Sequence, residues 1–231
     1  MFDGVILLDK KPGASSNYFL GQLKKKLSLP RGFKVGHTGT LDPFASGLLV
    51  CLLGKATKLA PFFPSDKAYQ ATLKLGFCTD SLDITGNVLQ HQVVKATLAD
   101  LKAAADLLVK NDLQDIPAFS AKKNQGVKMY QLAHKALPTP LMQKKIAIYE
   151  LSLTAFENDE LDFYTHCSSG TYIRQIGSDL AQLTHNLGTI SVLRRLRVGD
   201  FKVENAQPLE EITLSNLIPI TALFADLPHL S

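Results

Sequence analysis

The residues best suited to chemistry lie in one glycine-rich segment, residues 35–48, with the sequence VGHTGTLDPFASGL. Its single carboxylate, Asp42, is surrounded by three glycines, a histidine, a proline and several small hydroxyl residues. Because glycine adopts backbone conformations that other residues resist, we expect a shaped loop between regular elements. Catalytic groups are often placed on such loops. An Asp-Pro pair also starts turns and caps helices, so Asp42 and Pro43 on their own favour a structural role.

Apolar periodicity predicts the elements that must position this loop. The expected strands cover residues 5–8, 48–53, 67–76, 146–156, 160–167 and 192–203. One expected helix begins at Ser15 or Ser16 and runs through Leu27, and others cover residues 56–63, 97–110, 127–137 and 171–187. The remainder, from residue 208 to 231, is expected to form short helical pieces.

Capping and turn residues add detail to these elements. Thr97 is expected to cap its helix with Asp100 in the first turn, and Asn158 with Asp159 to form a hairpin turn. Gly188 is expected to end the helix 171–187 as a left-handed cap. The irregular alternation of strands and helices predicts an α+β fold, a mixed, largely antiparallel central sheet with flanking helices. With no linker visible, residues 1–231 are expected to form a single domain.

Positive charge gathers in three clusters, although the formal net charge is only +4. The clusters are Lys24, Lys25, Lys26, Arg31 and Lys34, then Lys122, Lys123 and Lys128, and finally Arg194, Arg195 and Arg197. Each alone is typical of a solvated surface. Because all three flank candidate site loops, together they indicate a nucleic acid as partner.

The cysteines and the apolar runs exclude other classes of protein. Cys51, Cys78 and Cys167 are far apart, so the sequence predicts neither a metal site nor a disulfide framework and favours a reducing compartment. The apolar run 48–53 is far shorter than the roughly 20 residues that a membrane helix needs. Acidic residues flank the apolar stretch 5–8, which excludes a secretory signal. We therefore expect a soluble, cytoplasmic protein.

Five segments in chain order carry a more specific signal. They are residues 8–16 (LDKKPGASS), the loop 35–48, residues 67–69 (KAY), residues 114–130, and residues 167–174 (CSSGTYIR) followed by 193–196 (LRRL). Together they resemble the motifs of the TruB family, tRNA pseudouridine synthases that act on uridine 55 of the TΨC loop. The resemblance runs from about residue 4 to about residue 205. It implies the pseudouridine synthase fold, a single catalytic domain and tRNA, through its T arm, as partner.

The resemblance identifies Asp42 as the nucleophile. Isomerisation of uridine breaks the bond from N1 to C1′, turns the base over and joins C5 to C1′. This reaction needs no redox step and no external group, in agreement with the absence of a cofactor or metal signature. A carboxylate can attack C1′ of the sugar or C6 of the base, or assist cleavage and take a proton. The sequence leaves these routes open.

The resemblance also supplies partners for Asp42. Burial alone raises the pKa of a carboxyl group, whereas a neighbouring arginine lowers it by about 1–3 units. Arg174 is implied as that arginine; without the resemblance it would pass for a phosphate contact or a surface residue. Tyr69, by itself an ordinary strand aromatic, is implied to stack on the flipped uracil.

Four further residues are implied to bind the substrate. Tyr172 contacts the same nucleotide, and Leu193 forms an apolar wall whose backbone meets the uracil edge. His37 enters the RNA and fills the space left by the extruded nucleotide, whose flipping costs a few kcal/mol. Lys10 is implied to be a phosphate contact or a loop contact.

The chain departs from the family pattern at several positions and in its length. The departures are Lys11 with Pro12 in exchanged order, Ile116 for proline, His134 for arginine and Ser169 for lysine. They bear on affinity rather than on the reaction. Bacterial members commonly carry a C-terminal RNA-binding domain of PUA type, for which this sequence leaves no room. We therefore expect a monomer whose catalytic domain binds tRNA through its basic clusters and the segment 122–134, weakly and with strong salt dependence.

Three other functions compete with this interpretation. A tRNA-folding chaperone with little dependence on catalysis is a competing function, although every residue that the chemistry needs is present. An enzyme acting on another RNA, as guide-dependent relatives do, is a second, but those relatives are longer. A hydrolase is disfavoured because the sequence offers no nucleophilic serine motif and no metal ligands.

Overall fold

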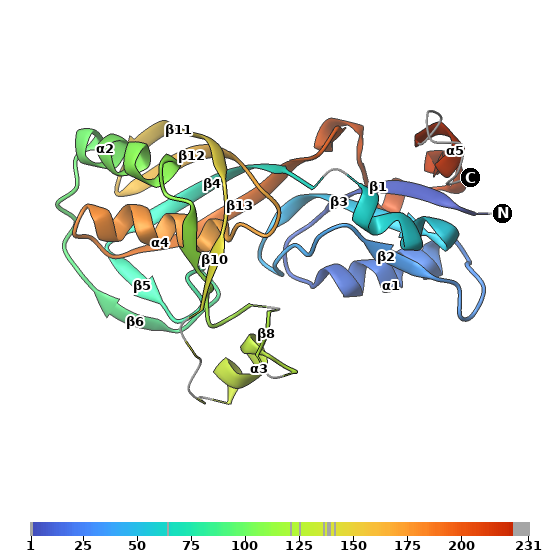
Figure 1. Ribbon diagram of the computed structural model, residues 1–231, viewed down its shortest axis with the longest axis horizontal. Helices are drawn as coiled ribbons and strands as arrows, with labels where there is room; N and C mark the ends of the chain where they lie inside the picture. The colour runs from blue at the N-terminus through green and yellow to red at the C-terminus, as the bar shows by residue number, and fades with distance from the viewer. Residues whose placement is uncertain are drawn as a thin grey trace. The chain divides into compact units, whose positions relative to one another are not determined.

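The computed structural model describes residues 2–63, 65–120, 122–124, 126–135, 137, 140 and 142–223 (Figure 1). At residues 123, 124, 128 and 134 only the backbone is described. The chain forms two compact units. Unit 1 contains Met1–Ala68 and Arg194–Ser231, and unit 2 contains Tyr69–Leu193. The chain passes between them within two strands, β4 (Lys67–Leu75) and β13 (Gly188–Val198).

The sheet of unit 1 is built around a long antiparallel pair, β1 (Gly4–Lys10) and β3 (Ser46–Leu53), which are aligned from Gly4 opposite Leu53 to Lys10 opposite Gly47. Strand β3 also pairs antiparallel with β2 (Val35–His37) and parallel with the end of β13. Short strands extend the sheet: β14 (Phe201–Lys202) beside β13, and β15 (Gln207–Pro208) and β16 (Ile218–Pro219) beside β1. The sheet is therefore mixed.

Helical pieces cover this sheet. Helix α1 (Ser16–Lys26) begins at Ser15, whose hydroxyl accepts a hydrogen bond from the backbone N–H of Tyr18 at 3.2 Å. The others are the 3₁₀ helices η1 (Gly54–Phe62), η2 (Val203–Asn205), η3 (Leu209–Glu211) and η4 (Leu214–Asn216), and the short helix α5 (Ile220–Leu223).

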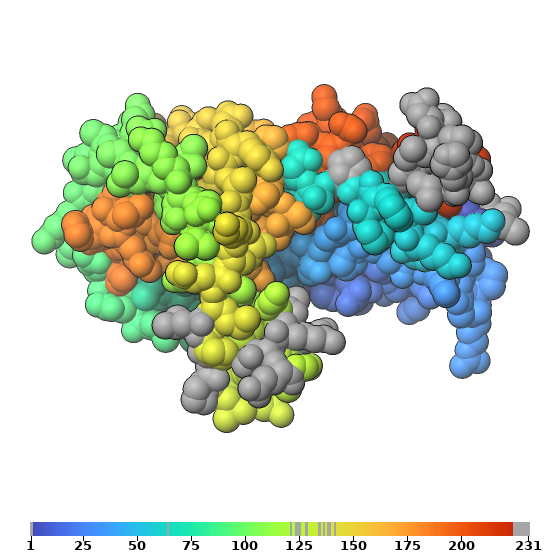
Figure 2. All heavy atoms as spheres, in the orientation of Figure 1, coloured from blue at the N-terminus to red at the C-terminus, as the bar shows by residue number. Residues whose placement is uncertain are grey.

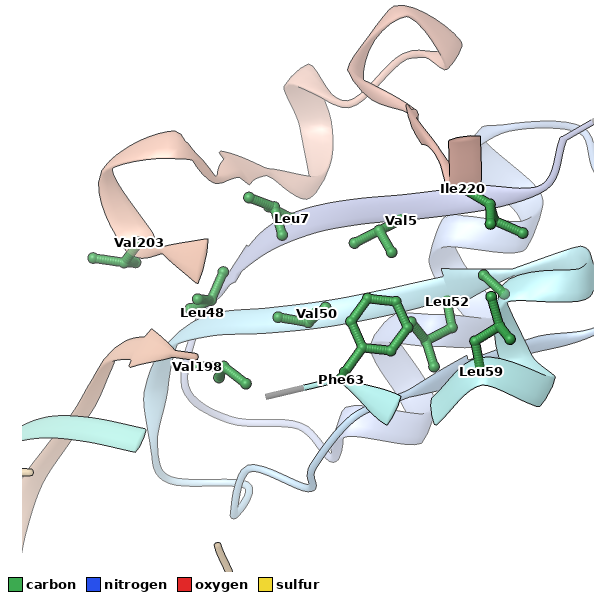
Figure 3. Close-up of a cluster of buried hydrophobic side chains, with 11 residues drawn as sticks. Val5, Leu7, Leu48, Val50, Leu52, Leu59, Phe63, Val198, Val203 and Ile220 are labelled. Carbon is green, nitrogen blue, oxygen red and sulfur yellow. The ribbon is translucent and has the colours of Figure 1, made fainter. Parts of the chain in front are cut away.

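Alternation along β1 and β3 divides the core of unit 1 between two faces. Val5 and Leu7 point to one face, where they pack with Val50 and Phe63 (Figure 3). Ile6 and Leu8 lie on the opposite face, against Leu20 and Leu23 of α1 and Leu27 directly after it. Both faces of the pair are thus buried, which fixes its register. The same packing holds β3, the strand that follows the Asp42 loop, in place.

Unit 2 contains the other part of the sheet and two long helices. Strand β4 lies between β12 (Glu160–Cys167) and β13, and β12 pairs antiparallel with β11 (Ile148–Glu157). Helix α2 (Leu98–Val109) packs on β11 and against α4 (Ile173–Leu183). The smaller elements are the pairs β5 (Phe77–Thr79) with β6 (Val88–His91), β7 (Leu113–Asp115) with β10 (Gln143–Lys145), and β8 (Lys123–Asn124) with β9 (Val127–Lys128), and helix α3 (Met129–His134).

The mixed-sheet α+β fold is confirmed, and so are several local expectations. Thr97 and Asp100 form a reciprocal capping box at the start of α2. Asn158 and Asp159 form the turn between β11 and β12 with φ angles of +51° and +62°. The expected single domain stays a prediction.

Other expectations were wrong. Helix α4 ends at Leu183, and Gly188 begins β13 instead of capping the helix. A Cβ at Gly188 would lie 2.8 Å from Cβ of Ala181 and from a methyl group of Leu73, so the glycine allows close packing. Residues 127–137 contain one short helix, α3, preceded by the β8–β9 pair; Pro138, the expected stop, lies outside the described residues.

The remaining differences concern element boundaries. Strand β2 lies inside the expected loop, and the expected strand 192–203 begins at Gly188 and ends at Val198. No helix in the described part of the chain is long and apolar enough to span a membrane.

Candidate active site

Asp42 lies in unit 1, on the connection between β2 and β3, and is half-buried. Hydrogen bonds hold the backbone on both sides of it. The hydroxyl of Ser16, at the start of α1, accepts from the N–H of Leu41 at 2.8 Å and donates to the carbonyl oxygen of Leu41 at 2.9 Å. The N–H of Gly13 donates to the carbonyl of Pro43 at 2.8 Å. The loop is therefore tied to the α1 start and to the turn before it.

Lys10 is a second constraint on the loop. Its side chain has no exposed surface, and Nζ donates to the carbonyl oxygens of Pro43 at 3.2 Å, Ala45 at 2.7 Å and Lys11 at 3.0 Å. An ammonium group has three hydrogens, and these three acceptors match them. Burial lowers the pKa of Lys10 to about 8; the charge of Asp42 opposes this shift, and Arg195 adds to it. Of the two implied roles, the contacts of Lys10 are those of a loop contact.

Arg195, from the end of β13, is a third constraint. It is fully buried, and its guanidinium donates from Nε to the carbonyl of Leu48 at 2.7 Å, from Nη2 to Gly39 at 3.0 Å and from Nη1 to Thr40 at 3.3 Å. The sequence had placed this residue in a basic cluster facing a nucleic acid. That interpretation was wrong for Arg195, because a buried guanidinium does not present its charge at the surface.

The other two arginines of that cluster form ion pairs within unit 1. Arg194 donates to the Asp9 carboxylate from both terminal guanidinium nitrogens, Nη1 at 3.0 Å and Nη2 at 2.7 Å. Arg197 lies 3.2 Å from Asp66. In contrast, Lys25, Arg31 and Lys34 of the first cluster are exposed, on the end of α1 and the connection to β2, which projects from unit 1 (Figure 1).

His37 ends β2 opposite Cys51 of β3 and is half-buried. Burial lowers its pKa, and the nearby charge of Arg195 lowers it further. His37 is therefore held neutral near physiological pH, which suits a side chain that contacts bases more than one that binds phosphate.

In unit 2, Arg174 lies in the first turn of α4 and is 4% exposed. Its guanidinium donates to the carbonyl oxygens of Ser81 and, at 2.8 Å, of Phe119, and lies 3.6 Å from the carboxylate of Asp83. Sequence reasoning missed Asp83, which belongs to a tight turn where it also accepts hydrogen bonds from the backbone and hydroxyl of Thr85. In the sequence, the polar turn around Asp83 is the feature that could have pointed to it.

The remaining substrate-binding candidates also belong to unit 2. Tyr172 precedes α4, and both its backbone groups bind the buried side chain of Gln114: its N–H donates to Oε1 at 2.8 Å, and its carbonyl accepts from Nε2 at 3.1 Å. Tyr69 and Leu193 lie on the neighbouring strands β4 and β13 and are 7% and 5% exposed. Gln114 was recognised as part of a motif, but its function as an anchor for Tyr172 was missed.

The structure thus gathers the candidates into two sets. Lys10, His37 and Asp42 belong to unit 1, and Tyr69, Tyr172, Arg174 and Leu193 to unit 2. The expected pairing of Arg174 with Asp42 stays a prediction. No group of three or more histidine, cysteine or acidic side chains that could hold a metal ion occurs among the described residues.

Comparison with known proteins gives the family. The model of the TruB family pseudouridylate synthase N-terminal domain matches residues 24–173. The chain belongs to the TruB family. A relative named tRNA pseudouridine synthase B, from Acholeplasma laidlawii, is 40% identical over 96% of this chain and 78% of its own length. The protein of the same name from Vibrio vulnificus is 41% identical over 91% of this chain and 66% of its own.

Solved structures agree with this membership. The Cbf5–Nop10–Gar1 complex contains a chain that is 27% identical, with a TM-score of 0.69 over 93% of this chain and 53% of that one. A chain in the H/ACA RNP bound to a substrate RNA containing 2′-deoxyuridine is 26% identical, with a TM-score of 0.61 over 92% of this chain and 51% of that one. The chain thus spans about half the length of these two structural relatives.

Proposed function

We propose that this TruB family member converts uridine 55 in the TΨC loop of tRNA to pseudouridine, with Asp42 as the nucleophile. The observation that carries the proposal is the Asp42 loop itself. Its backbone is held by buried donors from three separate elements: Lys10 of β1, Ser16 of α1 and Arg195 of β13. A surface turn needs no such support, whereas a reacting group must be held within a fraction of an ångström of its target.

The charges around the loop suit an anionic nucleophile. Lys10 and Arg195 place two buried cations beside the backbone that carries Asp42. A nucleophilic carboxylate carries negative charge, and cations held close to it attract that charge. The family resemblance supports Arg174 as a further cation acting on Asp42.

The substrate is proposed from the relatives and from the aromatic and apolar candidates. The curated relatives are named tRNA pseudouridine synthase B, and a solved relative is bound to a substrate RNA. Tyr69, Tyr172 and Leu193 offer rings and an apolar side chain to a flipped uracil, and neutral His37 is suited to fill the emptied stack. We expect the T arm of tRNA to be bound by a monomer.

The test uses an unmodified tRNA transcript that carries tritium at C5 of its uridines. Formation of the C5–C1′ bond replaces the C5 hydrogen, so turnover releases tritium into water. The native chain is compared with Asp42→Asn, which keeps the size of the side chain and its ability to accept a hydrogen bond but removes the nucleophilic charge. Mapping of the modified nucleotide then gives the position.

Release from position 55 by the native chain, abolished in Asp42→Asn, supports the proposed reaction and site. Release from another position refutes the assigned target. If tRNA is bound and folded equally well by both proteins and no tritium is released, the chaperone interpretation replaces the enzymatic one.

A further inference from the structure

Arg195 is one of the three buried side chains that hold the Asp42 loop, and it is the one arginine among them. It and Lys10 are the largest side chains without exposed surface in the described part of the chain. Burying a charged group is unfavourable unless its hydrogen-bonding capacity is met. A fold that needed only bulk at this point would place a leucine or methionine there, so the buried guanidinium calls for an explanation.

The guanidinium joins the loop to the sheet. Nε donates to the carbonyl of Leu48, in β3, while Nη2 and Nη1 donate to Gly39 and Thr40. Gly39 and Thr40 lie three and two positions before Asp42. Arginine presents its donors in a rigid planar fork, so three carbonyl groups bound to one fork have fixed positions relative to one another. Lysine has a single ammonium on a flexible stem and does not reproduce this geometry.

One glycine of the loop motif is explained by the same arginine. Gly47, directly opposite Arg195 in the parallel pair of β3 and β13, has a φ of +101°, and a Cβ there would overlap the backbone of Arg195. At Gly47 the chain therefore approaches the arginine more closely than a larger residue allows. Gly39 is in ordinary contact with the guanidinium, because a Cβ there would lie 3.6 Å from Nη1 of Arg195 and 3.0 Å from the end of the Lys67 side chain.

Side chains other than Arg195 also hold the chain next to Asp42. On its C-terminal side, Lys10 holds Pro43 and Ala45, and on its N-terminal side Ser16 holds Leu41. Arg195 donates to Gly39 and Thr40, which lie between β2 and Leu41, so this approach of the chain to Asp42 is tied to the sheet.

We propose that Arg195 is a positioning residue, which sets the location of the Asp42 carboxylate by holding the carbonyl groups of Gly39 and Thr40. This proposal rests on the proposed function of Asp42. A purely structural arginine would contribute to folding and leave the rate of the bound complex unchanged. A phosphate contact would affect the affinity for RNA. A positioning residue affects the rate at saturating RNA and leaves the affinity intact.

The test measures three quantities for each variant: the melting temperature, the Kd for tRNA, and the single-turnover rate of tritium release at saturating protein. Arg195→Lys keeps the charge but loses the fork. The matched control is Arg197→Lys, which makes the same change two positions along β13, where the guanidinium binds Asp66 and the carbonyl of Gly199. Gly39→Val is a second probe. The backbone of Gly39 has no positive φ, and a valine there carries two methyl groups beyond a Cβ that would already lie 3.6 Å from Nη1 of Arg195. The variant therefore leaves the arginine in place and crowds the loop away from it.

Displacing a reacting group by about 1 Å can lower a rate about 100-fold. We expect Arg195→Lys to reduce the single-turnover rate by about that factor, with Kd within about threefold of the native value, and Gly39→Val to reduce the rate about tenfold. Arg197→Lys is expected to keep the native rate within about threefold, because the two partners described for its guanidinium, Asp66 and the carbonyl of Gly199, lie outside the Asp42 loop.

Each outcome decides the proposal. A native rate in folded Arg195→Lys overturns it, and so does a loss confined to Kd. If Arg195→Lys does not fold, Gly39→Val decides, and a native rate in that variant overturns the proposal. Absence of tritium release by the native chain is a separate result, which refutes the proposed function instead.

Discussion

A half-buried carboxylate in unit 2 offers a test of the energetics of the fold. Asp179 lies on α4, half-buried, at a groove of about 610 Å³ between α2, α4 and the β7–β10 pair. In Figure 2 the residues of α2 in green, α4 in orange and β10 in yellow meet on this face. Burial raises the pKa of Asp179 from 3.8 to about 6; a hydrogen bond donated by Gln175 at 2.8 Å opposes this, and the charge of Asp115 adds to it.

The raised pKa predicts the sign and size of the effect on stability. Above pH 6 the carboxylate is ionised in both states, and the folded state bears the full penalty of burying the charge. Below pH 3.8 it is protonated in both states, so the penalty is absent. Each pKa unit corresponds to about 1.4 kcal/mol, so the shift amounts to about 3 kcal/mol, which partial exposure reduces to about 2 kcal/mol.

Asp179→Asn removes the charge and keeps an oxygen that accepts from Gln175. At pH 7.5 the variant is expected to have a free energy of unfolding about 2 kcal/mol higher than the native chain, and the difference should fall to less than about 1 kcal/mol at pH 4.5. Urea denaturation at the two pH values measures this. The control is Asp106→Asn, which removes an exposed carboxylate from neighbouring α2.

The reasoning is refuted if Asp179→Asn is no more stable than the native chain at pH 7.5. It is refuted equally if its advantage does not change with pH, since the gain would then come from something other than ionisation. A gain of the same size in Asp106→Asn would assign the effect to net charge.

Three other features of the chain lead to measurable outcomes. Gly47→Ala is expected to lower the free energy of unfolding by about 3 kcal/mol, because its backbone has positive φ and its Cβ would overlap Arg195; chemical denaturation measures the loss. Asp83→Asn is expected to cost about 3 kcal/mol and to lower tritium release, because it breaks the buried ion pair with Arg174. The Kd for tRNA is expected to rise steeply with salt, and neutralising exposed Arg31 is expected to reduce the slope of log Kd against log salt by about 1.

Each of these outcomes has a result that contradicts it. A native stability in Gly47→Ala would mean that the strand relaxes away from Arg195. Native turnover in Asp83→Asn would show that Arg174 keeps its position without the charge of Asp83. A salt slope near zero would exclude the exposed lysines and arginines as phosphate contacts.

Short-range signals were sufficient for the elements that the sequence predicted. The reciprocal cap of Thr97 and Asp100 involves residues three apart, and the turn at Asn158 and Asp159 joins adjacent strands. Such features depend on local backbone geometry, so one segment contains all the information. The Asp42 loop was located in the same way, from glycine content and from its likeness to a family motif.

Glycine explains one of the errors. Gly188 follows an amphipathic helix, a position where a left-handed cap is common, and the pattern alone does not separate that use from close packing. In the structure Gly188 serves close packing, because Ala181 and Leu73 leave no room for a Cβ. Leu73 is more than a hundred positions away, so no local pattern contains it.

Strand alternation would have separated Arg195 from its neighbour Arg194 in the sequence analysis. Side chains alternate across a strand, so Leu193 and Arg195 share one face of β13 and Arg194 lies on the other. Leu193 and Arg195 are buried, whereas Arg194 is half-buried and binds Asp9. The three arginines are neighbours in the chain, but a strand places neighbours on opposite sides, so they do not form one surface. The acceptors of Arg195 lie 147 to 156 positions earlier in the sequence. Their identity required the fold, and so did the inward direction of Arg195, because Val192, Leu196 and Val198 make the opposite face of the strand the more apolar one.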